Sequence, residues 1–394
     1  MSHWVRVVGA GVLPFAKPGV GASLHDMGSA AVKLALADSS LDYADVQQAF
    51  VGHVYGDSTS GQSALYGVGM TGLPVVNVNN NCASGASALY LGAQAIRAGA
   101  DCILVLGMEQ MLPGALQSAF PHHPSPLRRH GESLVRLMDF DPSLSVTAQF
   151  YAAAAREYLA LHGQTSAVLG EVVSAFRRHA AHNPVAVFRE QVSAQDVLRS
   201  ATVCEPITRL QCCAPTSGAA ALILSSHDFA QRRGLLTRGP ALREISMATD
   251  LPATFESGSA MALMGSDESR RASAAVYEAS GLGVADCQLV ELHDSFAINA
   301  VVSIEALGLA DAGAAVRLIH DGQHTYGGRW VVNPSGGLIS KGHPLGATGV
   351  AQVVEVVQQL RGEAGMRQVP RARAGLCHNQ GIGGATVVSL LTVD

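Results

Sequence analysis

The sequence of 394 residues has few charged residues, no long basic run and no long uninterrupted apolar run. Charged side chains make up 14% of the chain, and 31 acidic residues against 26 basic ones give a formal net charge of -5. Binding to the phosphates of DNA or RNA therefore has no support, and we expect no nucleic-acid partner. Glycine, serine or a charged residue breaks every apolar stretch before it reaches about 18 residues, which predicts no membrane span.

The sequence also lacks cysteines at the spacing of a Cys-x-x-Cys motif. The seven cysteines are spread over the chain without any Cys-x-x-Cys spacing, and the vicinal Cys212 and Cys213 are interpreted as part of a packed strand. This pattern argues against a disulfide framework and a structural zinc site, so we expect reduced thiols and no bound metal. Residues 1–15 predict a short strand rather than an export signal, and we therefore expect a cytoplasmic protein.

Short β-branched strands alternate with alanine-rich helices, which is typical of an α/β fold. The order of elements occurs twice, because residues 41–47 align with 282–288 and residues 75–77 align with 331–333. Chance identity would explain one such pair, but two pairs in the same order favour an internal duplication.

The duplication predicts a division of the chain into two core halves. Residues 1–115 together with 202–228 form the first half, and residues 229–394 form the second. Between them, residues 116–201 change pattern, with closely spaced prolines followed by helical stretches. We expect this insert to be a loop domain or lid.

Cys82 follows a polar stretch that ends a predicted strand, and a predicted helix starts at this residue. A thiol at the N-terminus of a helix faces the positive end of the helix dipole, which favours the thiolate and a lowered pKa. Cys82 is therefore a candidate nucleophile. The alternative is a small apolar residue that fills a strand-to-helix corner.

Three further polar turns follow predicted strands, at His293, His343 and Cys377. His343 lies in a glycine-rich turn that corresponds to the Cys82 turn of the other half, and a proline follows it. A histidine fixed in this way suits a general base, although a lone loop histidine is more often only hydrogen-bonded. Ligands of α/β sheets bind beyond the carboxyl ends of strands, so the four turns predict one shared site.

These motifs together resemble the thiolase superfamily, and more narrowly its sterol-carrier-protein type. The likeness covers the chain from about Val5 to Leu391, and its motifs are Asn79-Asn80-Asn81-Cys82-Ala83-Ser84, Leu210-Gln211-Cys212-Cys213, His293-Asp294-Ser295-Phe296, the run from Asn333 to Gly349 with Gly342-His343-Pro344, and the turn from Cys377. The resemblance implies a thiolase-like fold of two βαβαβαββ halves with an inserted loop domain. It also implies coenzyme A thioester substrates, no permanent cofactor, and a homodimer or tetramer.

The resemblance also assigns roles to single residues. Cys82 would be the acylated nucleophile, and His343 would be its base and would help to bind the thioester oxygen. His293 would hold a water at that oxyanion site. The backbone NH groups of Cys82 and Asn379 would line a second oxyanion hole.

One residue departs from the resembled pattern. Sterol-carrier-type thiolases usually read His-Asp-Cys-Phe in the third turn and use that cysteine for proton transfer, whereas this chain has Ser295. A hydroxyl is too weak an acid for this role. Cys377 would replace it, because other thiolases keep their acid/base cysteine there. The alternative is that Cys377 only packs at a strand end and that thiolysis is lost or altered.

We therefore expect a thiolase that acts on 3-oxoacyl-CoA through an acyl-enzyme. A second hypothesis is a thiolase-fold acyltransferase or carbon-carbon lyase of a secondary pathway, working with a small partner subunit. A third is a non-catalytic protein that binds acyl-CoA or lipid. CoA is expected under the insert, with its phosphates near Arg128 and Arg129 or Arg177 and Arg178, unless these are only a solvated face.

Overall fold

A computed structural model describes residues 4–112, 114 and 122–393 of the chain. In this part of the chain, no helix combines the length and the apolar character needed to cross a membrane.

The elements of the first half are β1 (Val5–Val12), α1 (Leu24–Ser39), β2 (Gln48–Gly52), α2 (Ser60–Tyr66), β3 (Val75–Val78), α3 (Ser84–Arg97), β4 (Cys102–Glu109) and β7 (Gly218–Ser226). After α8 (His227–Arg232), the second half has β8 (Ala241–Ala248), α9 (Pro252–Glu256), α10 (Ala260–Leu263), α11 (Ser266–Ser280), β9 (Leu289–Glu291), α12 (Ala297–Ala306), α13 (Ala315–His320), β10 (Val331–Val332), α14 (Gly337–Ser340), α15 (Leu345–Arg361), β11 (Ala374–Gly381) and β12 (Ala385–Thr392).

The duplication predicted from the sequence is present in the sheet. The strands of one ten-stranded sheet run in the order β10-β9-β11-β12-β8-β1-β7-β4-β2-β3. Counted from the centre outward, the second half repeats the strand order of the first, and the two halves meet where β1 pairs antiparallel with β8. Both halves have the connectivity βαβαβαββ, and the aligned segments of the sequence form matching 3-10 turns at Tyr43–Asp45 and Val284–Asp286.

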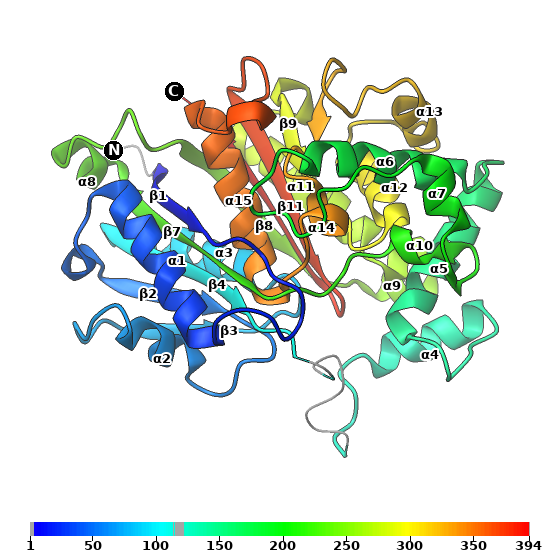
Figure 1. Cartoon of the computed structure of the whole chain (residues 1–394), viewed down its shortest axis with the longest axis horizontal. Coiled ribbons are helices and arrows are strands. Elements are labelled where there is room, and N and C mark those ends of the chain that lie inside the picture. Colours follow the sequence, from blue (N-terminus) through cyan, green and yellow to red (C-terminus); the bar gives the residue numbers. More distant parts are fainter. Residues whose placement is uncertain (1–3, 113, 115–121, 394) are drawn as a thin grey trace.

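Helices α3 and α15 form the centre of the molecule, because each contacts strands of both halves. In Figure 1, α1 and α2 lie on the outer side of the first half, and α11 and α12 lie in the second half. The two central helices approach each other very closely at their N-termini. A Cβ on Gly85 would lie 2.5 Å from the carbonyl oxygen of Gly346, and one on Gly349 would lie 2.6 Å from the backbone nitrogen of Ala86. Only glycine permits this backbone contact.

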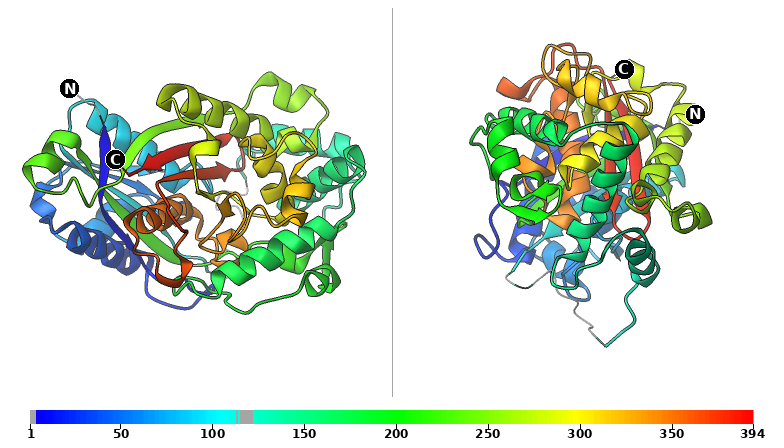
Figure 2. Two further views of the ribbon diagram at one scale, coloured as in Figure 1. Left: turned by 90° about the horizontal axis from the view of Figure 1, so that it is seen from above. Right: turned by 90° about the vertical axis from the view of Figure 1, so that its right-hand side faces the viewer.

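The insert contributes α4 (Arg128–Leu137), α5 (Val146–Leu161), α6 (Ala167–Ala180), α7 (Ala194–Arg199) and the hairpin of β5 (Thr202–Cys204) and β6 (Ile207–Thr208). In the sequence, the insert lies between β4 and β7 of the first half. Its helices nevertheless pack on helices of the second half, namely α9, α10, α12, α13 and α14. Figure 2 shows α5 and α6 beside the helices of the second half. The predicted start at residue 116 lies outside the described residues, and the hairpin beyond the predicted end at 201 packs on α5 and α7.

Candidate active site

Cys82 and His343 occupy equivalent positions in the two halves. Cys82 lies between β3 and α3, directly before Ala83, the N-cap of α3, and His343 lies between β10 and α15, directly before Pro344, the N-cap of α15. We expected the helix to start at Cys82, but its first helical residue is Ser84. The close packing of α3 on α15 brings these two turns to one place.

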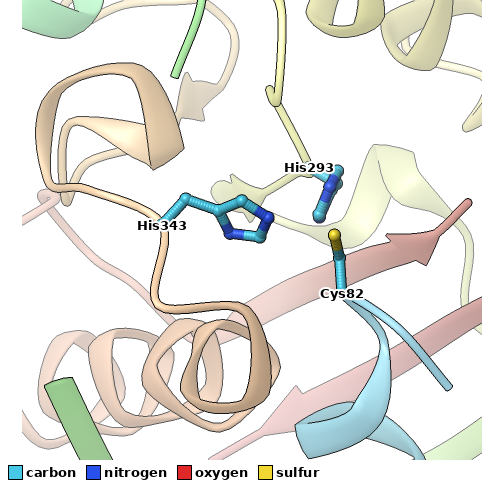
Figure 3. A group of neighbouring side chains, drawn as sticks. All are labelled: Cys82, His293 and His343. Atoms are coloured by element: carbon cyan, nitrogen blue, oxygen red, sulfur yellow. The ribbon is translucent and has the colours of Figure 1, made fainter. Parts of the chain in front are cut away.

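Three side chains meet at this place, from Cys82, His293 and His343. His293 comes from the turn between β9 and α12, and one sulfur or ring nitrogen from each residue lies within 4.8 Å of the others. The two imidazole rings are nearly perpendicular, at 86°, with centroids 5.2 Å apart. Figure 3 shows the sulfur of Cys82 pointing toward the two rings. The predicted shared site thus contains these three residues.

His343 is held with one ring nitrogen free to accept a proton. Its Nδ1 lies 2.7 Å from the hydroxyl of Thr348, and that hydroxyl donates its own proton to the carbonyl of Pro344 at 2.9 Å. The proton of neutral His343 is therefore on Nδ1, and the buried Nε2 has no hydrogen-bond partner. Burial, with the nearby Lys341 charge, lowers the pKa of His343 to about 3, so the ring is neutral and can act as a base.

His293 has the opposite character, because its Nδ1 is already engaged. The side-chain NH2 of Asn379 lies 3.0 Å from this nitrogen and donates to it, which leaves the proton of neutral His293 on Nε2. Burial, together with His343 and His378, lowers the pKa of His293 well below its ordinary value. His293 is thus a neutral donor, suited to a water or a carbonyl oxygen, and Asn379 is its positioning partner.

The predicted low pKa of Cys82 is wrong. Burial of the thiol, followed by the nearby carboxylate of Glu109, raises the pKa of Cys82 to about 12, which outweighs the contact of its own backbone NH with the sulfur. Glu109 accepts hydrogen bonds from the backbone nitrogens of Val54, Tyr55 and Gly346 and so cannot leave the site. The resting residue is a thiol, and it needs a base to become a nucleophile.

The structure does not bring Cys377 to this group. Cys377 lies opposite Glu291 of β9 and Ser389 of β12, bonds to Ser389, and packs in an apolar cluster that includes Val354 of α15. Asn379, two residues further along β11 and on the same side as Cys377, is the residue of this side that contacts His293, so Cys377 lies one side-chain repeat away from it. The position of Cys377 therefore supports the packing interpretation rather than the predicted role in proton transfer.

His378 is a residue that the sequence did not single out. Its Nδ1 accepts a hydrogen bond of 3.3 Å from the backbone nitrogen of His293, and its Nε2 lies 2.9 Å from the hydroxyl of Ser269. Burial lowers the pKa of His378 to about 3. With both ring nitrogens engaged, His378 positions the His293 turn.

Two further residues lie near Ser295, and neither of them was predicted to belong to the site. Tyr151 of α5 stacks on Phe296 with ring centroids 4.2 Å apart, and its hydroxyl bonds to Ser295. Cys213 donates its backbone NH to the carbonyl oxygen of Ser295 at 2.9 Å. Both residues interact electrostatically with Cys82. No sequence spacing connects positions 151, 213 and 295, so only the fold reveals this neighbourhood.

The four predicted arginines have different surroundings. Arg128 is exposed and paired with a glutamate of its own helix, and Arg129 is exposed and stacks over a phenylalanine of α9. Arg177 is buried and lies over the ring of Phe188, so it is not available to a phosphate. Arg178 is exposed and lines a cavity of about 360 Å³. That cavity is also lined by His179, His182, Thr325, Tyr326, Met366 and Arg367.

Comparison with known proteins identifies the family of the chain. Residues 5–228 match "Thiolase, N-terminal domain", and residues 253–392 match "Thiolase C-terminal domain-like". The chain belongs to the thiolase family. It is 44% identical to "Sterol carrier protein 2" of Gallus gallus over 393 residues, which cover 99% of this chain and 72% of that protein. It is 32% identical to "Acetyl-CoA acetyltransferase" of Methanothermobacter thermautotrophicus, covering 94% of both chains.

The fold of this thiolase-family chain also matches solved structures. "Ltp2-ChsH2(DUF35) aldolase" superposes with a TM-score of 0.83 over all of this chain and 98% of the other, at 23% identity. At this identity the match speaks for the fold alone. The predicted thiolase-like fold and the resemblance to the sterol-carrier-protein type are thus confirmed.

Proposed function

We propose that this thiolase-family protein cleaves or forms 3-oxoacyl-CoA through an acyl-enzyme on Cys82. The observation that carries this proposal is the unpartnered, buried Nε2 of His343 beside the protonated thiol of Cys82. A neutral imidazole and a neutral thiol at this distance form the nucleophile and base of covalent catalysis.

The residues suggest the following sequence of steps. As the Cys82 sulfur attacks the 3-oxo carbon, its proton passes to Nε2 of His343. The bond between C2 and C3 then breaks, which leaves the acyl group on the sulfur and an acetyl-CoA enolate that takes a proton. A second CoA thiol attacks the acyl-enzyme, loses its proton to a base, and releases Cys82. CoA acts as a substrate in this scheme, and no permanent cofactor takes part.

Two groups suit the oxygens that gain charge during these steps. Nε2 of His293 carries a proton and lies within the same group of atoms as the sulfur, so it can hold a water or the thioester oxygen. We keep the backbone NH groups of Cys82 and Asn379 as the proposed second oxyanion hole, which would stabilise the tetrahedral intermediate.

Intact-protein mass after mixing with acetoacetyl-CoA tests the proposal. We expect one acetyl group per chain, located on Cys82 by peptide mapping, because only this cysteine adjoins a free histidine nitrogen. Cys82→Ser should remove the adduct, and Cys377→Ala, which changes a cysteine outside the group, should retain it. A wild-type protein that binds acyl-CoA without any adduct would instead support the non-catalytic alternative.

A carbon-carbon lyase remains the second candidate, and Ser295 is the observation that favours it. A thiolase needs a group that exchanges a proton with the substrate α-carbon, and a serine hydroxyl does not supply one at neutral pH. A structural neighbour is named an aldolase and contains a DUF35 partner, which suggests a small accessory subunit here as well. Cleavage of a 3-hydroxyacyl-CoA by the Cys82→Ser variant would favour this alternative, since that reaction needs no acyl-enzyme.

We further propose that Arg178 contacts a phosphate of CoA, because it alone of the four arginines is exposed and lines a cavity. Arg178→Ala should raise the Kd for CoA by roughly tenfold or more, the loss expected for one charge-assisted hydrogen bond. Arg128→Ala, which changes an exposed arginine with its own glutamate partner, should leave the Kd unchanged. Isothermal titration with CoA measures both, and equal values for the two variants would leave Arg178 as a solvated residue.

A further inference from the structure

The group that exchanges a proton with the substrate α-carbon is not accounted for by the residues above. Cys377 faces an apolar cluster, and both ring nitrogens of His378 are engaged. Ser295 carries an alcohol hydroxyl and its partner Tyr151 a phenol hydroxyl, and both are intrinsically weaker acids than a thiol. Neither hydroxyl suits proton exchange near neutral pH.

Cys213 is the residue opposite Ser295 in a short antiparallel bridge. Cys212 pairs with Phe296, and the backbone NH of Cys213 donates to the carbonyl oxygen of Ser295 at 2.9 Å. Residues directly opposite each other in an antiparallel pair project to the same side, with Cβ atoms about 4.5–5.5 Å apart. The Cys213 thiol is therefore on the same side as the Ser295 hydroxyl, and that of Cys212 is on the other.

The chain after Cys213 is fixed to the turn that holds the base. The carbonyl oxygen of Ala214 accepts a hydrogen bond of 3.2 Å from the backbone nitrogen of His343, and the backbone nitrogen of Thr216 donates to the carbonyl of His343 at 3.3 Å. Cys213 thus lies between the Ser295 turn and the His343 turn. Burial, and after it the charge of Cys82, raises the pKa of Cys213, and the residue as a whole is half-buried.

We propose that the Cys213 thiol is the acid and base for the substrate α-carbon, in the role that Ser295 cannot fill. This inference rests on the proposed function, since it supplies the second proton transfer of the same reaction. In cleavage, the Cys213 S–H bond breaks and its proton forms the new C–H bond at C2 of the acetyl-CoA enolate. The Cys213 thiolate then takes the proton of the incoming CoA thiol, and His343 returns its proton to the Cys82 sulfur as that sulfur leaves the acyl group, so protons and charges balance over one turnover.

The resting state of Cys213 fits this order of events. Burial raises its pKa well above the ordinary value, so the residue starts as a protonated thiol. An enolate is a far stronger base than a thiolate, and proton transfer to it is favourable even from such a thiol. The unpartnered Nε2 of His343 receives the separate proton of Cys82, so the two transfers use different groups.

Two readouts separate the acylation step from the α-carbon step. Acylation of Cys82 by acetyl-CoA is followed by intact-protein mass, and deuterium incorporation at C2 of acetyl-CoA in D2O is followed by NMR. Cys213→Ala should keep acylation and lower deuterium exchange and thiolysis by roughly 10²-fold or more. Cys213→Ser preserves the shape of the side chain and should show the same loss. Cys212→Ala is the matched control and should retain both activities.

A rescue variant makes the test specific. Ser295→Cys in the Cys213→Ala background returns a thiol to the opposite residue and should recover at least about tenfold in exchange. Normal exchange in both Cys213 variants, with Cys82 still acylated, would overturn this inference alone. A wild-type protein without acylation would overturn the proposed function together with it.

Discussion

Replacing His343 with alanine is expected to lower the rate of Cys82 acylation by roughly 10²- to 10⁴-fold, the size of a general-base contribution. The pKa of Cys82 is about 12, so at pH 7 only about one thiol in 10⁵ is ionised without help. The free Nε2 of His343 is the acceptor that the structure supplies for this proton. Stopped-flow mixing with acetoacetyl-CoA measures the rate directly.

The pH dependence of the same variant gives an independent check. In the wild type, the thiol titrates near pH 12 and the imidazole near pH 3, so these two groups leave acylation nearly independent of pH between about 5 and 9, apart from a modest change near pH 7, where burial places the pKa of Glu109 beside the thiol. Without the base, the rate should follow the thiolate and rise about tenfold for each pH unit. His293→Ala is the control and should lack this slope, because its Nδ1 is engaged by Asn379. A pH-independent His343→Ala variant would show that another group takes the proton.

Substituting Gly85 with alanine is expected to reduce acylation by about 10²-fold with the chemical groups unchanged. The added Cβ would lie 2.5 Å from the carbonyl oxygen of Gly346, which belongs to the backbone of α15, and neither atom can rotate away. Helix α3 must therefore shift from α15, which separates Cys82 from His343, and a misplacement of about 1 Å has an effect of this size. Overpacking of this kind also lowers the free energy of unfolding by about 1–3 kcal/mol.

A matched glycine provides the control for this substitution. Gly131 also lies in a helix, but a Cβ there meets no atom within 4 Å, so Gly131→Ala should leave acylation unchanged and slightly stabilise the helix. Acylation rates and urea unfolding curves of the two variants are compared. If Gly85→Ala reacted as fast as Gly131→Ala, close packing of the two helices would not determine the geometry of the site.

Local patterns of the sequence predicted the elements and the turns well. The strand and helix around Cys82 and the helices of the insert follow from short-range periodicity, and the segments 41–47 and 282–288 that align in the sequence form the same kind of turn in both halves. Cys377 shows where such patterns fail, because a run of small and apolar residues does not show where a strand ends. The sequence places Cys377 in a turn after a strand, whereas it lies inside β11, opposite Glu291 of β9 and Ser389 of β12, and Asn379 two residues further on is the residue that reaches His293.

Electrostatics and pairing between distant segments account for the remaining differences between the site predicted from the sequence and the site in the structure. The helix position of Cys82 suggested a lowered pKa, whereas burial and the carboxylate of Glu109 act in the opposite direction and are larger. Glu109 is far away in the sequence and reaches the site only through the ladder of β2 and β4. The neighbourhood of Cys213 and Ser295 likewise depends on a bridge between distant segments, which no local pattern reveals.

The equivalent positions of Cys82 and His343 have a consequence for how the activity arises during synthesis. The ribosome makes the turn that carries the nucleophile early and the turn that carries the base only after residue 343. A nascent chain or a proteolytic fragment that ends before this point holds the thiol without its proton acceptor. If Cys82 and His343 act as proposed, acyl transfer requires that the second copy of the turn is complete and that α15 has packed on α3, so the activity would be acquired only by the fully folded chain.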